Sequence, residues 1–295
     1  MDPQYIVFGL VVGVLVGLTG IGGGSLMTPL LILGGGVPPT VAIGTDLAYG
    51  AVTKTVGGWR HLRIGTVDLG VSKWLAFGSV PGSLVGVWAV NHLHSRHGDD
   101  FDGVLLAGVA GALLVVAGAI LYRVLFMPGA AERERHSVEI TRRVRIQAVT
   151  IGAVMGAILG MTSVGSGALI GLALILIFRL TPHRVVGTDV FHAAILLWTA
   201  ALAHGAAGNV DLVIAGTLLL GSVPGVWIGT MLLPKIPAHG LRPVLACVLL
   251  ASALAVLSKA GVDLPAWVIV AVPACAGLVA LLVHRRRSRP EVVPA

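Results

Sequence analysis

The sequence predicts an all-α polytopic membrane protein built from two inverted-topology repeats of about five segments each, with one extra C-terminal helix. Of the 295 residues, 56% are apolar and 11% are charged, and the mean hydropathy is +0.95. A soluble domain of this length could not hide so much apolar surface from water. In addition, the two halves of the chain match at one fixed offset, which indicates an internal duplication.

Hydropathy divides the chain into alternating apolar runs and short polar connections. Most runs are long enough to cross a hydrocarbon core of about 30 Å, which needs about 20 residues. The runs 25–35 and 168–178 have about half that length, and each follows a Gly-rich segment, so we expect two half-length helices. The complete set of runs is 4–20, 25–35, 41–59, 68–91, 101–126, 146–162, 168–178, 184–203, 210–233, 241–257 and 265–283.

The duplication is visible without a gap when the sequence is shifted by 143 positions. Apolar composition alone would give some chance identities, but it would not align Asp, His and Pro residues at a single offset. We therefore interpret the halves as copies of one unit. The aligned pairs include Gly17 and Gly160, Thr19 and Thr162, Pro39 and Pro182, Asp46 and Asp189, His61 and His204, and Asp68 and Asp211.

One strongly polar stretch separates the two halves, and it defines the domain organisation. We expect a first membrane repeat over 1–126, a cytoplasmic linker over 127–145 and a second membrane repeat over 146–260. The run 265–283 lies outside the duplication, so we assign residues 261–284 to an extra transmembrane helix and residues 285–295 to a cytoplasmic tail.

The distribution of Arg and Lys between the loops predicts the orientation in the membrane. With the Arg-rich linker in the cytoplasm, the N-terminus falls outside and the C-terminus falls in the cytoplasm. We expect a multi-pass protein of the cell inner (plasma) membrane. An odd number of segments per copy makes the two copies point in opposite directions. This parity holds whether a half-length run crosses alone or forms a re-entrant hairpin with its predecessor. A single broken helix made from both runs would place the Arg tail outside.

We therefore interpret the formal net charge of +7 as a determinant of membrane orientation and of binding to anionic lipid. We expect no nucleic-acid partner. The sequence has no phosphate-binding loop in a βαβ unit and no metal-ligand spacing. We expect no enzyme activity, no cofactor and no metal site. Membrane lipid and a small anionic substrate are the expected partners, and an oligomer is compatible with the sequence.

The two Gly-rich segments are the first candidate site. Gly interrupts a helix and exposes backbone N–H groups, and the short helix that follows adds its positive N-terminal dipole. Such a terminus is a ready anion site, and inverted-repeat transporters place two of them at the bilayer midplane. The alternative is a simple kink or a close helix crossing. The predicted substrate-binding residues are Thr19, Gly22, Gly23, Gly24, Ser25, Thr162, Gly165, Ser166, Gly167 and Ala168.

The Gly-Thr-Asp triplets are the second candidate site. Asp46 and Asp189, each preceded by its threonine (Thr45 and Thr188), lie near the start of apolar runs. Carboxylates at membrane depth default to a functional role as proton or cation carriers. The alternative is that each Asp accepts N–H bonds from a neighbouring broken helix, which suits a site for an anion better. Both roles, coupling and gating, stay open.

A lysine and a histidine accompany these triplets. Lys54 lies two turns beyond Asp46 and has no counterpart, because position 197 is Leu. It could neutralise Asp46, attract an anion, or be a lysine that snorkels to the interface. His192 is the counterpart of Tyr49 and could hydrogen-bond substrate or shuttle protons, although a histidine satisfied within the bundle is an equal alternative.

Three further pairs have simpler interpretations. Asp68 and Asp211 precede long runs, where N-capping explains them. We expect His61 and His204 to lie at the membrane interface. The Ser-Val-Pro-Gly motifs, which contain Pro81 and Pro224, lie inside long helices, where they serve packing or form a hinge.

These motifs resemble one known family. The segments GLTGIGGGSLMTPLL, VAIGTDLAYG and SVPGSLVG, with GMTSVGSGALIG, VVGTDVFHA and SVPGVWIG in the second half, are similar to the sulfite exporter TauE/SafE family of membrane permeases. The resemblance covers nearly all of residues 5–260. The serines at positions 163 and 166 depart from the GIGGG pattern of the first half.

The resemblance implies transport of small sulfur-containing anions, such as sulfite or a sulfonate. Together with the inverted repeats and the carboxylates at membrane depth, it leads us to expect a secondary transporter that works by alternating access at a midplane site, with proton or cation coupling as one role of Asp46 and Asp189. The alternatives are a passive anion channel and a permease for a non-sulfur small organic anion. A membrane enzyme would need a catalytic constellation, and a structural subunit would need a partner.

Overall fold

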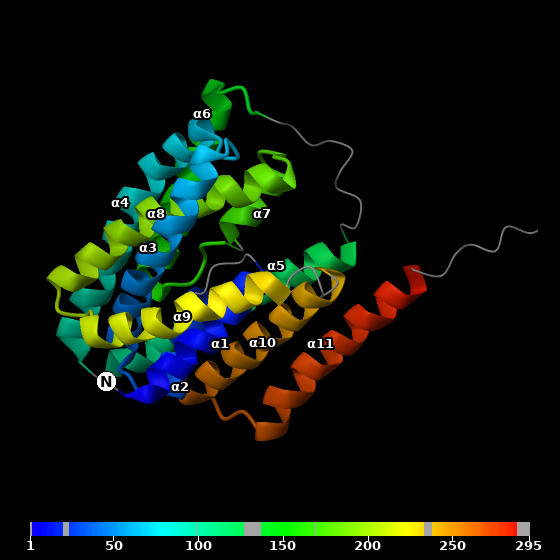
Figure 1. Ribbon diagram of the computed structural model, residues 1–295. Coiled ribbons are helices and arrows are strands. Elements are labelled where there is room, and N and C mark those ends of the chain that lie inside the picture. Colours follow the sequence, from blue (N-terminus) through cyan, green and yellow to red (C-terminus); the bar gives the residue numbers. More distant parts are fainter. Residues whose placement is uncertain are drawn as a thin grey trace, which may run out of the picture.

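The computed structural model describes residues 2–19, 24–98, 100–126, 137–167, 169–232 and 238–287. Each apolar run of the sequence corresponds to one helix in this described part, in the predicted order (Figure 1). The all-α fold class is therefore confirmed. The helices are α1 Pro3–Thr19, α2 Gly24–Leu33, α3 Pro39–Arg63, α4 Leu69–His97, α5 Asp100–Phe126, α6 Arg142–Thr162, α7 Leu169–Leu176, α8 Pro182–Ala206, α9 Leu212–Leu232, α10 Ala238–Lys259 and α11 Ala266–Arg287.

The helices α2 and α7 have the half-length that the sequence predicts, with 10 and 8 residues. Each folds back on the helix before it. The Gln4 side chain at the start of α1 donates a hydrogen bond to the Gly34 carbonyl beyond the end of α2, at 2.7 Å. Similarly, Gln147 near the start of α6 and Phe178 beyond α7 line one cavity of about 420 Å³. The structure therefore forms two hairpins rather than two broken straight helices.

The two halves pack on each other through reciprocal helix pairs. Three glycines of α1 lie against the backbone of α9, and their counterparts in α6 lie against the matching positions of α4. Small residues let helix backbones approach closely where lipid supplies no hydrophobic drive. The contacts join Gly9, Gly13 and Gly17 to Leu218, Ser222 and Val226, and Gly152, Gly156 and Gly160 to Leu75, Ser79 and Ser83.

Each contact in one of these interfaces is therefore repeated in the other with the two halves exchanged. Such self-complementary pairing is the signature of a two-fold relation. It explains why the glycine spacing is kept in both copies, since a methyl group added at Gly13 would lie 2.6 Å from the Ser222 carbonyl oxygen.

The central helices α3 and α8 occupy equivalent positions in the two halves and run antiparallel. Gly50 lies against Leu197, whereas Gly58, two turns later in α3, lies against Phe191, which comes earlier in α8. Copies that point in opposite directions require this arrangement. Figure 1 shows α3, α4, α6 and α8 on one side of the molecule and α1, α9, α10, α5 and α11 on the other.

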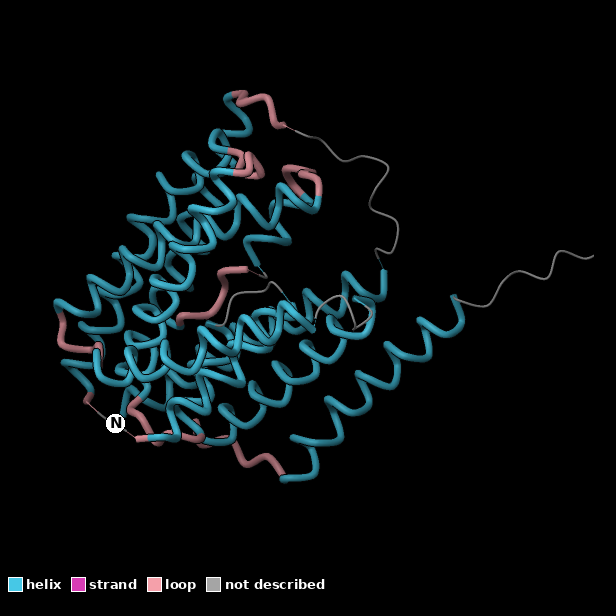
Figure 2. The backbone as a smooth tube through the Cα atoms, viewed as in Figure 1, coloured by secondary structure: helices cyan, strands magenta, loops and turns pink. Residues whose placement is uncertain are grey.

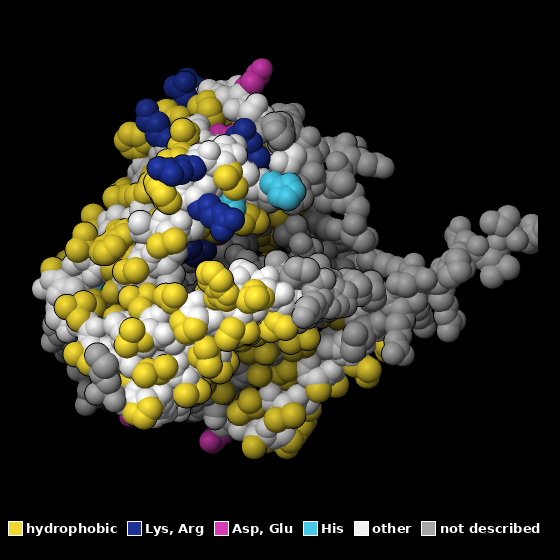
Figure 3. Space-filling view, viewed as in Figure 1, with side chains coloured by type: hydrophobic (Ala, Val, Ile, Leu, Met, Phe, Trp, Pro, Cys, Tyr) yellow, Lys and Arg dark blue, Asp and Glu magenta, His cyan; other side chains and the backbone are white. Residues whose placement is uncertain are grey.

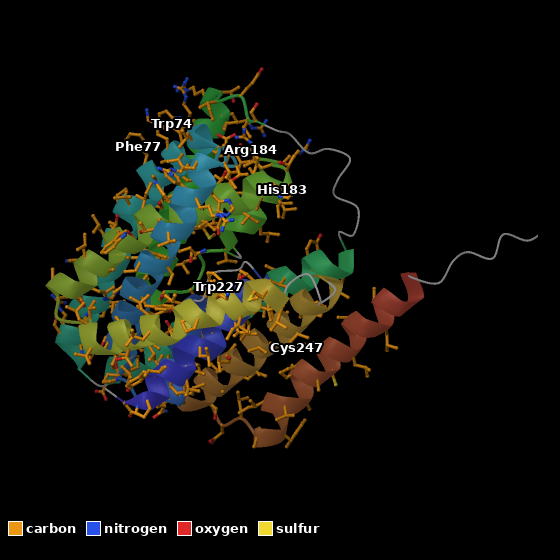
Figure 4. The ribbon with its side chains drawn as sticks, viewed as in Figure 1. Trp74, Phe77, His183, Arg184, Trp227 and Cys247 are labelled. Atoms are coloured by element: carbon orange, nitrogen blue, oxygen red, sulfur yellow. The ribbon has the colours of Figure 1, made fainter. Side chains whose placement is uncertain are left out.

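Positive side chains gather at one end of the molecule, and hydrophobic side chains cover most of the rest of the visible face (Figure 3). Side-chain sticks place His183 and Arg184, at the start of α8, toward the end of the molecule where Trp74 also lies (Figure 4). Arg184 donates to the Val67 carbonyl at 3.2 Å, and Arg145 lies over the Trp74 ring at 5.1 Å. The ends of α3 and α7 and the starts of α4, α6 and α8 therefore share one basic end.

Four helices of the described part are long and apolar enough to cross a membrane by length and composition: Asp100–Tyr122, Arg142–Thr162, His183–Ala206 and Leu212–Leu232. Shorter apolar helices cover Pro3–Leu18, Pro243–Lys259 and Ala266–Ala280. Large apolar side chains face outward along them, with Trp227 70% and Leu212 76% exposed. A soluble protein rarely exposes so much contiguous apolar surface, so these faces suit contact with lipid.

Candidate functional site

The carboxylate of Asp46 connects the two halves in the interior. Its Oδ2 atom accepts a hydrogen bond from the Thr28 hydroxyl of α2 at 2.5 Å and another from the Ser163 hydroxyl at 2.9 Å. Asp46 is fully buried. Thr28 lies one turn into the half-length helix of the first repeat, and Ser163 begins the Gly-rich segment of the second. One side chain of α3 therefore brings the two candidate regions together.

Asp189, the counterpart of Asp46, has different partners. Its Oδ1 atom accepts the Gly167 N–H at 3.1 Å, and its Oδ2 atom lies 3.7 Å from the Lys54 ammonium. Both side chains are buried, so this ion pair is shielded from water. The structure thus assigns Lys54 to the Asp of the other repeat rather than to Asp46, and it removes the alternative of a lysine that snorkels to the interface.

The threonines of the triplets form a reciprocal pair of hydrogen bonds between the halves. The Thr45 hydroxyl accepts the Asp211 N–H at 3.0 Å, and the Thr188 hydroxyl accepts the Asp68 N–H at 2.8 Å. The preceding glycines allow this close approach, since a Cβ atom at Gly187 would lie 2.7 Å from a backbone carbonyl oxygen. The threonines therefore hold each central helix to the start of a long helix in the other repeat.

The predicted N-caps of those long helices are confirmed. The Asp68 carboxylate accepts the Val71 N–H at 3.0 Å, and the Asp211 carboxylate accepts the Ile214 N–H at 2.9 Å. Each of these Asp residues therefore bonds to a triplet threonine through its backbone N–H and caps a helix with its carboxylate. These bonds join α3 to the start of α9 and α8 to the start of α4.

The second Gly-rich segment leaves backbone donors free in the interior. Figure 2 shows this loop between α6 and α7 in the middle of the molecule, away from the connecting loops at its ends. Ser163, Gly165 and Gly167 have φ values of 59°, 132° and 95°, which is left-handed backbone that breaks the helix. Among the described contacts, the N–H groups of Gly165 and Ser166 have no acceptor, while the Gly167 N–H is held by Asp189.

The side chains beside these donors are polar and buried. Ser166 and Thr162 are each 5% exposed, and the Thr162 hydroxyl donates to the Ile158 carbonyl at 2.7 Å. Ser25, at the start of α2, is also buried. Gly22, Gly23 and Ala168 lie outside the described residues, and for Thr19 and Gly24 only the helical backbone is described. The predicted roles of these five residues therefore stay predictions.

His192 and Tyr49 occupy equivalent positions and find equivalent partners. The His192 Nε2 atom lies 2.8 Å from the Ser79 hydroxyl, and Tyr49 interacts with the Ser222 side chain. The serines belong to the Ser-Val-Pro-Gly motifs, and both prolines lie inside continuous helices. These contacts tie α8 to α4 and α3 to α9, which gives the motifs a packing role.

One expectation from the sequence is wrong. His204 is fully buried rather than interfacial, and its Nε2 atom donates to the Gly160 carbonyl at 2.9 Å. Gly160 lies in the last turn of α6, where carbonyl groups lose their partners inside the helix. His204 therefore caps the helix that leads into the second Gly-rich segment.

Thr28, which contacts Asp46 directly, was not predicted from the sequence. The signal for it was a hydroxyl residue in an otherwise apolar run, directly before Pro29. No cluster of three His, Cys, Asp or Glu side chains with metal-ligand geometry occurs in the part of the chain that the structure covers. The site is therefore made of hydroxyls, backbone donors, two carboxylates and one lysine.

Comparison with known proteins finds one matching family and several relatives. The family described as "Sulfite exporter TauE/SafE" matches residues 5–256. The chain is 37% identical over 254 residues to the "Probable membrane transporter protein YjnA" of Bacillus subtilis, a match that covers 86% of this chain and 99% of that protein. It is 30% identical over 261 residues to a "Probable membrane transporter protein" of Xylella fastidiosa, which covers 88% and 95%.

A plant protein is similar over a shorter region. The "Sulfite exporter TauE/SafE family protein 1" of Arabidopsis thaliana is 33% identical over 110 residues, which is 37% of this chain and 24% of that protein. No solved structure matches the chain.

The ion pair between Lys54 and Asp189 gives a test of the site's architecture. Replacement Lys54→Leu, the residue at the equivalent position of the second repeat, leaves a buried carboxylate without its cation. We expect a loss of about 3–5 kcal/mol in stability, because the remaining charge is unpaired. Thermal unfolding in detergent measures it.

The double variant Lys54→Leu with Asp189→Asn removes both charges, so we expect it to recover most of the lost stability. If the single and double variants were equally unstable, the proposed pairing would be wrong.

Proposed function

Because the chain belongs to the sulfite exporter TauE/SafE family, it is a multi-pass membrane transporter, and we propose that it carries a small sulfur-containing anion, such as sulfite or a sulfonate, by alternating access. The observation that supports this most strongly is the position of Asp46. It accepts hydrogen bonds from Thr28 in α2 of the first repeat and from Ser163 in the Gly-rich segment of the second, so the half-length helix of one repeat and the helix break of the other meet inside the molecule.

The chemistry of this place suits an oxyanion. The free N–H groups of Gly165 and Ser166, the Ser166 hydroxyl and the N-terminal dipole of α7 all favour negative charge. Lys54 balances Asp189, which limits the repulsion between that carboxylate and an anion. A tetrahedral or pyramidal oxyanion with several acceptor atoms can use several such donors at once.

The reciprocal packing of the halves supplies a mechanism. Each packing contact of α1 on α9 has a counterpart in the contact of α6 on α4. Rocking of one group of helices against the other would exchange these equivalent contacts, which is how inverted repeats give alternating access. Antiparallel α3 and α8 fit copies of opposite orientation.

We propose that the protein lies in the inner membrane of the cell with the basic end of the molecule facing the cytoplasm. The residues gathered there include Arg60, Arg63, Arg142, Arg143, Arg145, Arg179 and Arg184, whereas the opposite end carries Asp2, Asp100, Asp211 and Asp263 together with Arg96 and Lys259. An excess of Arg and Lys marks cytoplasmic loops. The N-terminus would then lie outside.

Cysteine labelling tests this orientation. In a background with Cys247 and Cys275 replaced by Ala, we expect Ser95→Cys, at the acidic end, to react with a membrane-impermeant maleimide in intact cells. Ile64→Cys, at the basic end, is exposed in the structure and is expected to react only after the membrane is opened. The reverse pattern, or labelling of both sites in intact cells, would contradict the proposed orientation.

Transport assays test the cargo. We expect purified protein in lipid vesicles to take up labelled sulfite or a small sulfonate in a saturable manner, accelerated by unlabelled anion on the other side. Ser166→Ala removes one hydroxyl donor and should raise the half-saturating concentration by about tenfold, as for one hydrogen bond to a charged group. Ser95→Ala, in an exposed position at the end of α4, is the matched control with no expected change.

Two results would reject this function. Electrical conductance without saturation or acceleration by unlabelled anion would indicate a passive channel. Transport of carboxylates but of no sulfur oxyanion would reject the cargo while leaving the transporter fold intact.

A further inference from the structure

The two equivalent carboxylates of the site have unequal surroundings. Asp189 has a cation 3.7 Å away and a backbone N–H on its other oxygen. Asp46 has two hydroxyl donors on Oδ2, whereas its Oδ1 atom is buried with no hydrogen-bond partner. Within the described residues, Asp46 also has no ion-pair partner. One carboxylate is thus compensated, and the other is not.

Three sequence differences between the repeats create this inequality. Thr28 is replaced by Gly171 in the second repeat, and Ser163 corresponds to a glycine at position 20, so Asp189 has no equivalent hydroxyl donors. Lys54 corresponds to Leu197, so Asp46 has no equivalent cation. The repeats therefore differ at the positions that contact these two carboxylates.

We propose that Asp46 is the proton-carrying group of the transporter, while Asp189 stays ionised as a structural partner of Lys54. A buried carboxylate without a cation is costly, and a proton removes that cost. The two hydroxyls on Oδ2 stabilise the ionised form enough for the proton to leave again, and the unpaired Oδ1 atom is free to take it up. The inference rests on the proposed transport function and names its coupling ion.

The proton step is a simple exchange with water. A proton from the aqueous phase on one side binds Oδ1 of Asp46, which becomes a neutral carboxyl group. It leaves to water on the other side after the site has changed its access. Because Asp46 holds α2 and the second Gly-rich segment through the same carboxylate, its charge state bears directly on how these two segments are joined.

The other titratable groups around Asp46 leave its charge uncompensated. Tyr49 lies one turn along α3 and is electrostatically coupled to Asp46. His204 of α8 lies against Gly44 and is held by the Gly160 carbonyl. Asp211 at the start of α9 carries a further negative charge near Thr45, and Lys54 is engaged by Asp189. A proton is therefore the simplest compensating charge.

Infrared spectroscopy of the purified protein in lipid tests the site without any substrate. We expect the band of a protonated carboxyl group to appear as the pH is lowered and to shift when the protein carries ¹³C-labelled aspartate. Asp46→Asn should remove this band. The double variant Lys54→Leu with Asp189→Asn, which changes the equivalent position, should keep it.

If Asp46→Asn does not fold, Asp46→Glu keeps an acid and should move the band to a different frequency. A band that persists in Asp46→Asn, is unchanged in Asp46→Glu, or disappears in the double variant would overturn the assignment. The absence of such a band from the wild-type protein at every pH at which it is folded would overturn it as well.

Vesicle transport tests the coupling itself. One proton coupled to each anion raises the accumulation ratio by up to about tenfold for a gradient of one pH unit. In Asp46→Asn, any residual transport of sulfite or sulfonate should no longer respond to the pH gradient. Accumulation driven by a sodium gradient but not by a pH gradient would overturn the proton assignment.

The two sets of results separate the two proposals. A titrating Asp46 band without transport of any sulfur anion contradicts the proposed function alone. Saturable sulfur-anion transport without that band contradicts the proton site alone.

Discussion

A helix that breaks inside a membrane leaves backbone donors that lipid cannot satisfy, and the rest of this structure depends on how those donors are held. The second Gly-rich segment gives one N–H to Asp189 and one hydroxyl to Asp46, and the N–H groups of Gly165 and Ser166 have no acceptor among the described residues. The partners come from α3 and α8, the antiparallel helices at the centre of the two-fold arrangement. The second break is therefore stabilised by the same residues that join the repeats.

The glycine interfaces bring those central residues together. Close packing of α1 on α9 and of α6 on α4 joins helices from different halves, so neither half completes its own interface. The triplet threonines then bind the start of a long helix in the opposite half. Symmetric packing thus surrounds two carboxylates whose hydrogen-bond and ion-pair partners differ.

Much of this fold could be predicted from the sequence because its signals are local or periodic. The apolar runs predict the helices, and the half-length runs after the glycines predict α2 and α7. The partners of the site residues could not be predicted, because they lie on other helices and several of them in the other half. Lys54 shares a helix with Asp46 yet meets Asp189, and His204 lies near a helix end yet caps α6. Nothing in local spacing encodes such contacts between separate helices.

The most direct test of this account is an experimental structure in lipid with a bromine-substituted sulfonate, located by its anomalous signal. The account predicts the sulfonate beside Gly165 and Ser166, at the N-terminal end of α7 and facing α2. An ordered sulfonate elsewhere, for example in the apolar groove between Phe77 and Ile195 on α4 and α8, would contradict it.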